Sequence, residues 1–303
     1  MLVNDLPTLR ESICQFLNLE LVETPVDYKV QEVTSHAGYR VERIICDAAD
    51  GDPIPAFLMM PNRDGVFPAV MVHHQHAGQR HLGKSEVIGL AGDPLQAFGP
   101  ALAARGFVVL APDSTCFEDR RKHASGIEPQ DGDDLQHFIE MGSRLVQGDT
   151  LMRKVLSDAS AGLSLLAHHP QVDNTKIGVC GHSYGGNTAL FQMAMEPRLA
   201  FGVSSGALCS YAYKHEHDIA LEMALIIPGF AAQWDLHHLL ACIAPRPLLV
   251  VSAKADKFSQ DADEVISRAQ PNDHIQHDRF SGGHALTQER FDAIVAFLCN
   301  CVA

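Results

Sequence analysis

The feature that most constrains the fold of this 303-residue chain is a regular alternation of short apolar segments with longer amphipathic ones. The short segments are rich in β-branched residues and bounded by Pro or Gly, which is typical of buried strands, and the longer ones are typical of crossover helices. The expected strands cover residues 67–73, 106–113, 176–180, 200–207, 247–252 and 274–280. This pattern predicts an α/β fold with a doubly wound, mostly parallel sheet and helices on both faces.

The connecting segments that look helical cover residues 94–105, 149–168, 187–195 and 287–298. The first 65 residues differ, because a short helical pattern over 9–19 is followed by alternating segments near 40–46 and 54–60 with turn residues between them. These two segments are expected to form antiparallel strands at one edge of the sheet.

Two stretches, 114–147 and 209–240, interrupt the alternation. Long excursions in a compact domain are usually functional, so both are expected to be lid or binding segments. Because no repeat or linker-like stretch divides the chain, a single domain over residues 1–303 is expected.

The balance of charge argues against two classes of partner. The chain has 23 lysine and arginine residues against 37 aspartate and glutamate residues, a formal net charge of −14. Such a surface repels phosphate backbones and anionic lipids, so no nucleic acid or membrane partner is expected. Residues 1–7 lack the features of a secretion signal and no later segment has about 20 continuous apolar residues, so we expect a cytoplasmic protein. The sequence leaves open whether the chain forms a homo-oligomer.

A nucleophile motif follows the expected strand 176–180. The hexapeptide Gly181-His182-Ser183-Tyr184-Gly185-Gly186 lies between this strand and a segment compatible with a helix. A sharp strand-to-helix turn requires glycines beside the serine, presents the hydroxyl above the sheet and directs the helix N-terminus toward developing negative charge. Ser183 is therefore predicted to be a nucleophile.

A serine hydroxyl needs a histidine to take its proton and a carboxylate to orient that histidine. Asp256 follows the strand ending at Ser252, and His284 follows the last strand in a loop with two glycines. Asp261 and Asp263 are rivals, but they fall where the next helix begins and suit its first turn. The chain order Ser183, Asp256, His284 is the order expected for this kind of site.

Other groups complete the expected site. The backbone N–H groups of Tyr184 and His76 are the candidates for stabilising an oxyanion. Gln75, Tyr211 and Trp234 are the candidates for contacting substrate, because amide and aromatic side chains suit a polar pocket. The 17 histidines include clusters, but no His-Glu-x-x-His sequence is present, so neither a metal nor another cofactor is expected. The eight scattered cysteines are expected to be buried free thiols.

From about Val41 to the C-terminus the sequence resembles the dienelactone-hydrolase-like and acetyl-xylan-esterase-like branch of the α/β hydrolases. The resemblance rests on the Ser183 motif and on the stretches Ala104 to Asp113, Pro170 to Asp173 and Ala244 to Leu249. It implies an α/β-hydrolase fold and hydrolysis of an ester. Relatives carry His-Gly-x-Gly where this chain has His74-Gln75-His76-Ala77, and dienelactone hydrolases themselves use a cysteine where this chain has Ser183. The serine in place of cysteine favours ordinary ester hydrolysis over dienelactone cleavage.

The function expected from these observations is a serine carboxylic-ester hydrolase that acts on a small or medium ester, such as an acetylated sugar or a lactone, through an acyl-enzyme. A peptidase related to the prolyl oligopeptidases is the alternative within the same chemistry. About 65 residues precede the strand 67–73, too few for the propeller of those enzymes, which favours the ester hydrolase. A non-catalytic binding protein on the same fold is the alternative from a different class.

Overall fold

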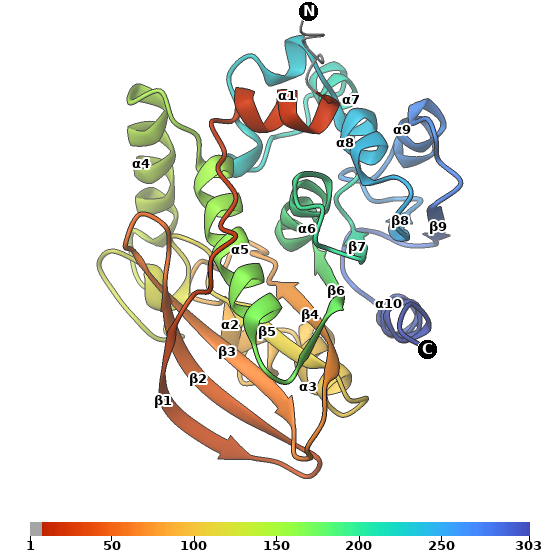
Figure 1. Cartoon of the computed structure of the whole chain (residues 1–303). Helices are drawn as coiled ribbons and strands as arrows, with labels where there is room; N and C mark the ends of the chain where they lie inside the picture. The colour runs from red at the N-terminus through yellow and green to blue at the C-terminus, as the bar shows by residue number, and fades with distance from the viewer. Residues whose placement is uncertain (1–7) are drawn as a thin grey trace, which may run out of the picture.

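A nine-stranded sheet forms the centre of the protein, with the order β1-β2-β3-β5-β4-β6-β7-β8-β9 (Figure 1). The computed structural model describes residues 8–303, so residues 1–7, and the expectation about a secretion signal that rests on them, lie outside the described residues. The strands are β1 (Tyr28–Ser35), β2 (Tyr39–Asp47), β3 (Pro53–Pro61), β4 (Phe67–His73), β5 (Val108–Pro112), β6 (Val172–His182), β7 (Phe201–Ser205), β8 (Leu248–Ala253) and β9 (Ile275–Phe280).

Strand directions divide the sheet into two parts. β1, β2, β3 and β5 pair antiparallel with their neighbours in that order. β5, β4, β6, β7, β8 and β9 run parallel to one another. The predicted α/β fold with antiparallel strands at the N-terminal edge is confirmed. Because the parallel strands share one direction, the loops that follow them meet along a single edge of the sheet.

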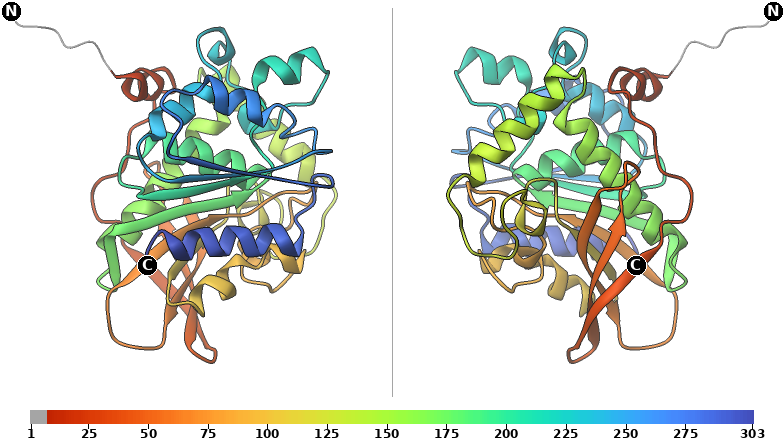
Figure 2. Two further views of the ribbon diagram at one scale, coloured as in Figure 1. Left: turned by 90° about the vertical axis from the view of Figure 1, so that its right-hand side faces the viewer. Right: turned by 90° about the vertical axis from the view of Figure 1, so that its left-hand side faces the viewer.

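Helices cover both faces of the sheet (Figure 2). They are α1 (Leu9–Phe16), α2 (Lys84–Val87), α3 (Phe98–Ala103), α4 (Asp133–Val146), α5 (Leu151–His168), α6 (Tyr184–Met195), α7 (Tyr211–Glu216), α8 (Leu236–Ile243), α9 (Ala262–Arg268) and α10 (Gln288–Asn300), with short 3₁₀ turns η1 (Pro94–Gln96), η2 (Glu118–Arg120), η3 (Met223–Leu225) and η4 (Phe230–Ala232).

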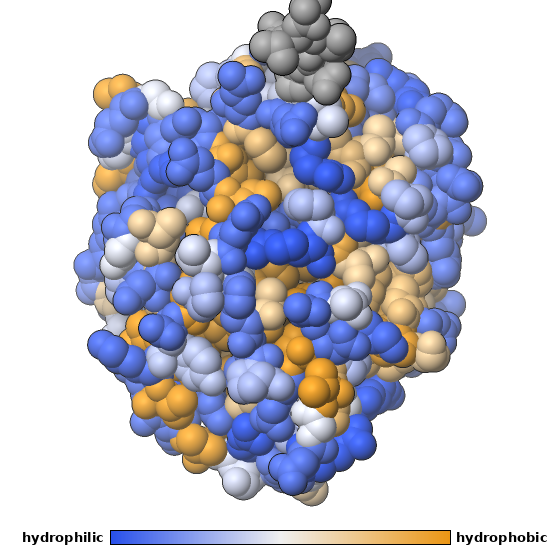
Figure 3. All heavy atoms as spheres, viewed as in Figure 1, coloured by the Kyte–Doolittle hydropathy of each residue, from blue (hydrophilic) through white to orange (hydrophobic). Residues whose placement is uncertain are grey.

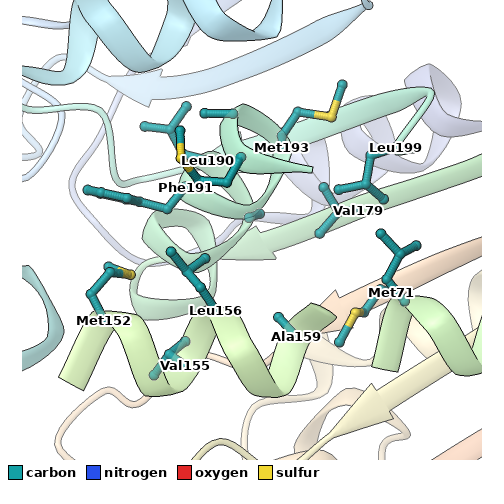
Figure 4. Close-up of a cluster of buried hydrophobic side chains, with 14 of the residues drawn as sticks. Met71, Met152, Val155, Leu156, Ala159, Val179, Leu190, Phe191, Met193 and Leu199 are labelled. Carbon is teal, nitrogen blue, oxygen red and sulfur yellow. The ribbon is translucent and has the colours of Figure 1, made fainter. Parts of the chain in front are cut away.

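Two apolar cores result from the alternation of side chains along the strands. On one face, Met71 and Val179 pack with Leu156 of α5 and Leu190 of α6 (Figure 4). On the other face, the strand side chains that point the opposite way, such as Val70 and Val109, pack with α3 and α10. Burying each large apolar side chain stabilises the fold by about 1.5–3 kcal/mol relative to leaving it exposed. These cores fix the strands whose ends carry the site.

Three elements differ from the sequence-based expectations. β1 was not expected, because its side chains are almost all exposed and it therefore lacks an alternating apolar pattern. The helix expected over 94–105 is interrupted at Ala97, where ψ is 58°, and is divided into η1 and α3. The segment 114–147 contains the 14-residue helix α4.

The surface is mainly polar on the face seen in Figure 1, with scattered apolar patches (Figure 3). The exposed apolar side chains include Phe138, Ile139 and Val146 of α4. In the part of the chain that the structure describes, no helix is both long enough and apolar enough to cross a membrane.

Candidate active site

Ser183 lies at the turn from β6 to α6, at the carboxyl edge of the parallel strands. Its backbone has φ 57° and ψ −117°, a conformation that a non-glycine residue rarely adopts. The Ser183 N–H donates a hydrogen bond to the carbonyl oxygen of Ser205, at 2.8 Å, which ties the turn to the end of β7. The strained conformation is therefore held by the neighbouring strand.

Close backbone packing explains the glycines beside Ser183. A Cβ on Gly181 would lie 2.3 Å from the backbone carbon of Gly185. A Cβ on Gly185 would lie 2.1 Å from the carbonyl oxygen of His73 at the end of β4. Neither separation is sterically allowed, so only glycine permits α6 to start this close to the sheet.

A chain of hydrogen bonds joins the three residues that the sequence singled out. His284 Nε2 lies 2.8 Å from Ser183 Oγ, and His284 Nδ1 lies 3.0 Å from Asp256 Oδ1. Because an ionised carboxylate only accepts hydrogen bonds, Nδ1 carries the proton and Nε2 is left to accept from the serine hydroxyl. This is the geometry needed to withdraw a proton from Ser183.

Asp256 is buried, and its two carboxylate oxygens have further donors. Oδ1 accepts from the N–H of Phe258 at 3.0 Å, and Oδ2 accepts from the hydroxyl of Ser259 at 2.7 Å. Burial raises the pKa of Asp256, but the hydrogen bonds and charge of His284, with help from Ser259 and Phe258, outweigh it and hold the pKa below its ordinary value. Asp256 therefore stays ionised near neutral pH.

The rival acids have other contacts. Asp261 accepts hydrogen bonds from the N–H and the hydroxyl of Ser210, and Asp263 lies in the first turn of α9 and pairs with Arg279. Among the described residues, Asp256 is the one carboxylate bonded to His284.

Arg290 of α10 holds the loop that carries His284. Its guanidinium donates to the carbonyl oxygens of Gly283 and Ala285, each at 2.8 Å, and of Ser281 at 2.6 Å. Three carbonyls bonded to one rigid, planar group restrict the loop more than solvent contacts would. Arg290 is itself buried, so it fixes the position of His284 from beneath.

His76 and Tyr184 are the residues whose backbone N–H groups are the candidates for stabilising an oxyanion. Both residues line the same cavity as Ser183. Within residues 8–303, neither N–H donates a hydrogen bond to the protein. The side chain of Tyr184 is buried instead, with its hydroxyl 2.6 Å from Ser114 Oγ. Burial, with a smaller contribution from Arg80, lowers the pKa of His76 to about 3, so its ring is neutral.

The cavity that contains Ser183 and His284 has a volume of about 330 Å³. Part of its wall comes from the segment 209–240, through Lys214, Ala220, Leu221, Glu222 and Leu225. Other lining residues are Ala77, Gly78, Asn187, Gly206, Ala207 and Phe258. None of the cavity-lining residues comes from 114–147, which packs behind Tyr184 through Phe117.

The three residues predicted to contact substrate lie elsewhere, and that prediction is corrected. Gln75 is buried and donates to Glu86 at 3.2 Å. The Tyr211 hydroxyl donates to the carbonyl oxygen of Leu225 at 2.9 Å, and its ring packs on Phe230. Trp234 packs edge-on against Phe16 of α1. The Tyr211 ring is buried and the Trp234 ring is half-buried, and neither ring lines the cavity.

Most of the clustered histidines near the site are hydrogen-bonded within the protein. His73 Nε2 lies 2.7 Å from Gln192 Oε1, and His74 Nε2 accepts from the N–H of Ser114 at 3.1 Å. One group in residues 8–303 has ligand atoms close enough together for a metal ion, and it consists of Asp113, Glu118 and Asp119. The ammonium of Lys84 contacts all three of these carboxylates. A lysine thus supplies the positive charge that this acidic group requires.

Comparison with known proteins assigns the chain to a family. The model of the dienelactone hydrolase family matches residues 54–292. The chain belongs to this family. The Bacillus subtilis protein YtaP is 27% identical over 246 residues, which cover 78% of this chain and 76% of YtaP.

Two solved structures show the same fold at low identity. Acetyl xylan esterase 1 from Thermoanaerobacterium superposes with a TM-score of 0.68 at 19% identity, covering 97% of this chain and 94% of that one. A glucuronoyl esterase from Solibacter usitatus superposes with a TM-score of 0.69 at 16% identity, covering 97% and 92%. The chain has the α/β-hydrolase fold, and its family supports an enzyme that hydrolyses esters.

Four residues of the candidate site are not predicted by the sequence. Lys214, Glu222 and Phe258 line the cavity, and Arg290 supports the His284 loop. Arg290 lies in the helix that follows His284, where a basic residue in a first turn is unfavourable for the helix dipole and could have drawn attention. No comparable signal marks Lys214 or Glu222.

Proposed function

We propose that the protein is a serine carboxylic-ester hydrolase in which Ser183 is the nucleophile, His284 the general base and Asp256 the orienting acid. The observation that carries the proposal is the continuous hydrogen-bonded chain from Ser183 Oγ through His284 to Asp256, at a strained strand-to-helix turn that opens into a cavity. An ordinary glycine-rich turn does not require this combination of a strained serine, a hydrogen-bonded histidine and aspartate, and a cavity.

The first half of the proposed reaction forms an acyl-enzyme. His284 Nε2 takes the proton of the Ser183 hydroxyl while Oγ attacks the ester carbonyl carbon. The carbonyl electrons move onto oxygen, and the N–H groups of Tyr184 and His76 stabilise this oxyanion. When the tetrahedral intermediate collapses, the C–O bond to the alcohol breaks and His284 returns the proton to the departing oxygen. Asp256 stabilises the imidazolium in between.

The second half regenerates the enzyme by the same groups. His284 takes a proton from water, and the resulting hydroxide attacks the acyl carbon bound to Ser183. Collapse of the second intermediate breaks the bond to Oγ, which regains its proton from His284. No metal or other cofactor takes part in these steps, because the three side chains supply nucleophile, base and charge stabilisation.

The substrate is proposed to be an ester with a short acyl group on a polar alcohol. A cavity of about 330 Å³ suits a small substrate, and its wall mixes the apolar Leu221 and Leu225 with the polar Lys214 and Glu222. Acetylated sugars and lactones are within this class, and two of the structural neighbours are named for esters of carbohydrates.

The test is a hydrolysis screen with wild-type protein and the Ser183→Ala variant. Acetyl, butyryl and octanoyl esters of one alcohol are compared with acetylated sugars, a lactone and a prolyl peptide. The wild type should cleave acetyl esters at least about tenfold better than octanoyl esters in kcat/KM, and Ser183→Ala should lose on the order of 10³-fold or more in kcat. Ser267→Ala, on the exposed surface of α9, is the matched control.

Two results would contradict the proposal. One is peptide cleavage without ester cleavage, which would indicate the peptidase. The other is a folded wild type that cleaves no ester, which would indicate a binding protein.

A further inference from the structure

Lys214 is a buried lysine in the wall of the Ser183 cavity, and its ammonium has no partner among the residues that the structure describes. It belongs to α7, is 4% exposed, and lines the cavity together with Ser183 and His284. Across residues 8–303, no hydrogen bond and no ion pair within 4.0 Å involves its ammonium. Burying an unpaired charge is unfavourable, so a group that the protein does not supply is expected to compensate it.

Two of the carboxylates that act electrostatically on Lys214 accept hydrogen bonds from other groups. Asp235 accepts from the N–H groups of Tyr211, Ala212 and Leu236. Asp261 accepts from the N–H and hydroxyl of Ser210. These bonds cap α7 and α8, and neither Asp235 nor Asp261 lines the cavity. They contribute to the electrostatic field at Lys214 without contacting it.

Glu222 is a second cavity-lining residue with an unused polar atom. Its Oε2 accepts from the N–H of Ala224 at 2.7 Å, whereas its Oε1 is buried and has no partner among the described residues. Burial raises the pKa of Glu222 to about 7, even though Arg80 and Lys214 act in the opposite direction. At and below neutral pH a large share of Glu222 is protonated, and Oε1 or Oε2 can then donate a hydrogen bond.

Besides Asp235 and Asp261, which act on Lys214, the charged group Arg80 acts on Glu222. Arg80 lies behind the wall, is buried, and has two guanidinium nitrogens, Nε and Nη1, with no hydrogen-bond partner in the described chain. Asp134, 3.5 Å from Arg80, is largely exposed to solvent, which screens its charge. Burial keeps His76 neutral. In an otherwise acidic protein, Lys214 thus contributes a positive charge to the wall of the cavity that contains the nucleophile.

We propose that Lys214 and Glu222 form a subsite that binds a carboxylate group carried by the ester substrate. This inference rests on the proposed function and specifies its substrate class. The ligand carboxylate accepts a charged hydrogen bond from Lys214 and a second one from protonated Glu222. The remaining wall of Leu221, Leu225 and Ala220 contacts the apolar body of the substrate.

The subsite predicts a direction of pH dependence. Burial lowers the pKa of Lys214, with Cys209, Asp261, Asp235 and Glu222 acting in the opposite direction. Binding an anion favours the protonated forms of both Lys214 and Glu222. Preference for a charged substrate over a neutral one is therefore largest below pH 7 and falls as the pH rises through the pKa of Glu222.

The test compares 4-acetoxybenzoate with its neutral analogue 4-acetoxybenzamide, which form the same acetyl-enzyme. At pH 6 the wild type should show a kcat/KM for the benzoate at least about tenfold higher than for the benzamide, as expected for one charged hydrogen bond. Lys214→Met should abolish this ratio and Lys214→Arg should retain most of it. In Glu222→Gln, the ratio of kcat/KM for the benzoate to that for the benzamide should fall less between pH 6 and pH 8 than it does in the wild type.

A charge-matched control separates the subsite from long-range electrostatics. Lys29→Met removes the same charge from the exposed strand β1 and should leave the ratio unchanged. A ratio near one in the wild type, or a ratio that survives Lys214→Met, would overturn the subsite.

A binding measurement keeps this result independent of catalysis. Calorimetry on the Ser183→Ala protein should show 4-hydroxybenzoate binding at least about tenfold tighter than 4-hydroxybenzamide at pH 6, and Lys214→Met should remove that difference. If no ester is hydrolysed by the wild type, the proposed function fails while this binding difference still decides the subsite. Equal binding of the two phenols would contradict the subsite and leave the esterase proposal standing.

Discussion

The loops that carry Ser183, Asp256 and His284 differ from the opposite wall of the same cavity in how completely their polar groups are bonded. Asp256 has three donors, His284 is bonded at both ring nitrogens, and Arg290 holds the His284 loop by three carbonyls. On the wall, Lys214 has no partner in the described chain and Glu222 has one free buried oxygen. Groups that must keep a fixed geometry are bonded within the protein, and groups that await a ligand are not.

Two buried lysines make the same contrast within one residue type. Lys84 is 1% exposed and contacts Asp113 and Asp119, each at 2.7 Å, and also Glu118. Lys214 is 4% exposed and contacts no carboxylate in residues 8–303. We therefore assign Lys84 to stability and Lys214 to ligand binding.

The largest effect is expected from the two aspartates. Asp256→Asn should lower kcat on the order of 10³- to 10⁴-fold, because the amide cannot stabilise the protonated imidazole or fix its tautomer. Asp261→Asn should leave kcat within about threefold, because Asp261 contacts Ser210 and not His284. Steady-state kinetics on both folded variants make the comparison. A greater loss of kcat for Asp261→Asn would show that the wrong acid has been assigned.

A stability measurement should separate the two lysines. Lys84→Met leaves the buried carboxylates of Asp113 and Glu118 without their cation, so its free energy of unfolding should fall by about 3–5 kcal/mol. Lys214→Met removes a buried charge that has no partner within residues 8–303, so the free energy of unfolding should change by less than about 1 kcal/mol or increase. Urea unfolding of both variants at pH 7 provides the measurement. Equal destabilisation would mean that Lys214 has a partner inside the protein.

A smaller effect is expected from the support of the His284 loop. Arg290→Met removes the donors to Ser281, Gly283 and Ala285, and a displaced imidazole should lower kcat by about 10- to 100-fold with little change in KM. Arg290→Lys should recover part of that loss. Arg279→Met, which breaks an ion pair with the exposed Asp263, is the control and should not affect kcat. An unchanged kcat for Arg290→Met would contradict the positioning role.

The sequence predicts most of the strands of the sheet, and it predicts the three residues Ser183, Asp256 and His284 that the structure joins by hydrogen bonds. Strands such as 67–73 and 247–252 are apolar on both faces and bounded by turn residues, so their pattern is local. Ser183 is recognisable because its glycines are required by the turn itself. Asp256 and His284 follow from their positions after strands, since loops after parallel strands share one edge.

The cavity wall could not be predicted in the same way. Which side chains of 209–240 face Ser183 depends on how α7 and the following turns pack on the body of the protein, and local composition does not encode that packing. Their aromatic character makes Tyr211 and Trp234 candidates for a pocket wall, but their rings pack against Phe230 and Phe16 instead. Lys214, a solvent-exposed residue type in most settings, lines the cavity instead.

Covalent labelling tests the central claim most directly, because it depends on an activated serine and not on knowing the substrate. The protein is incubated with a fluorophosphonate probe, and the labelled peptide is identified by mass spectrometry. The account predicts one label per chain on Ser183, a label that is lost in Ser183→Ala and formed far more slowly in His284→Gln. No labelling of the folded wild type, or a label on a different serine, would contradict it.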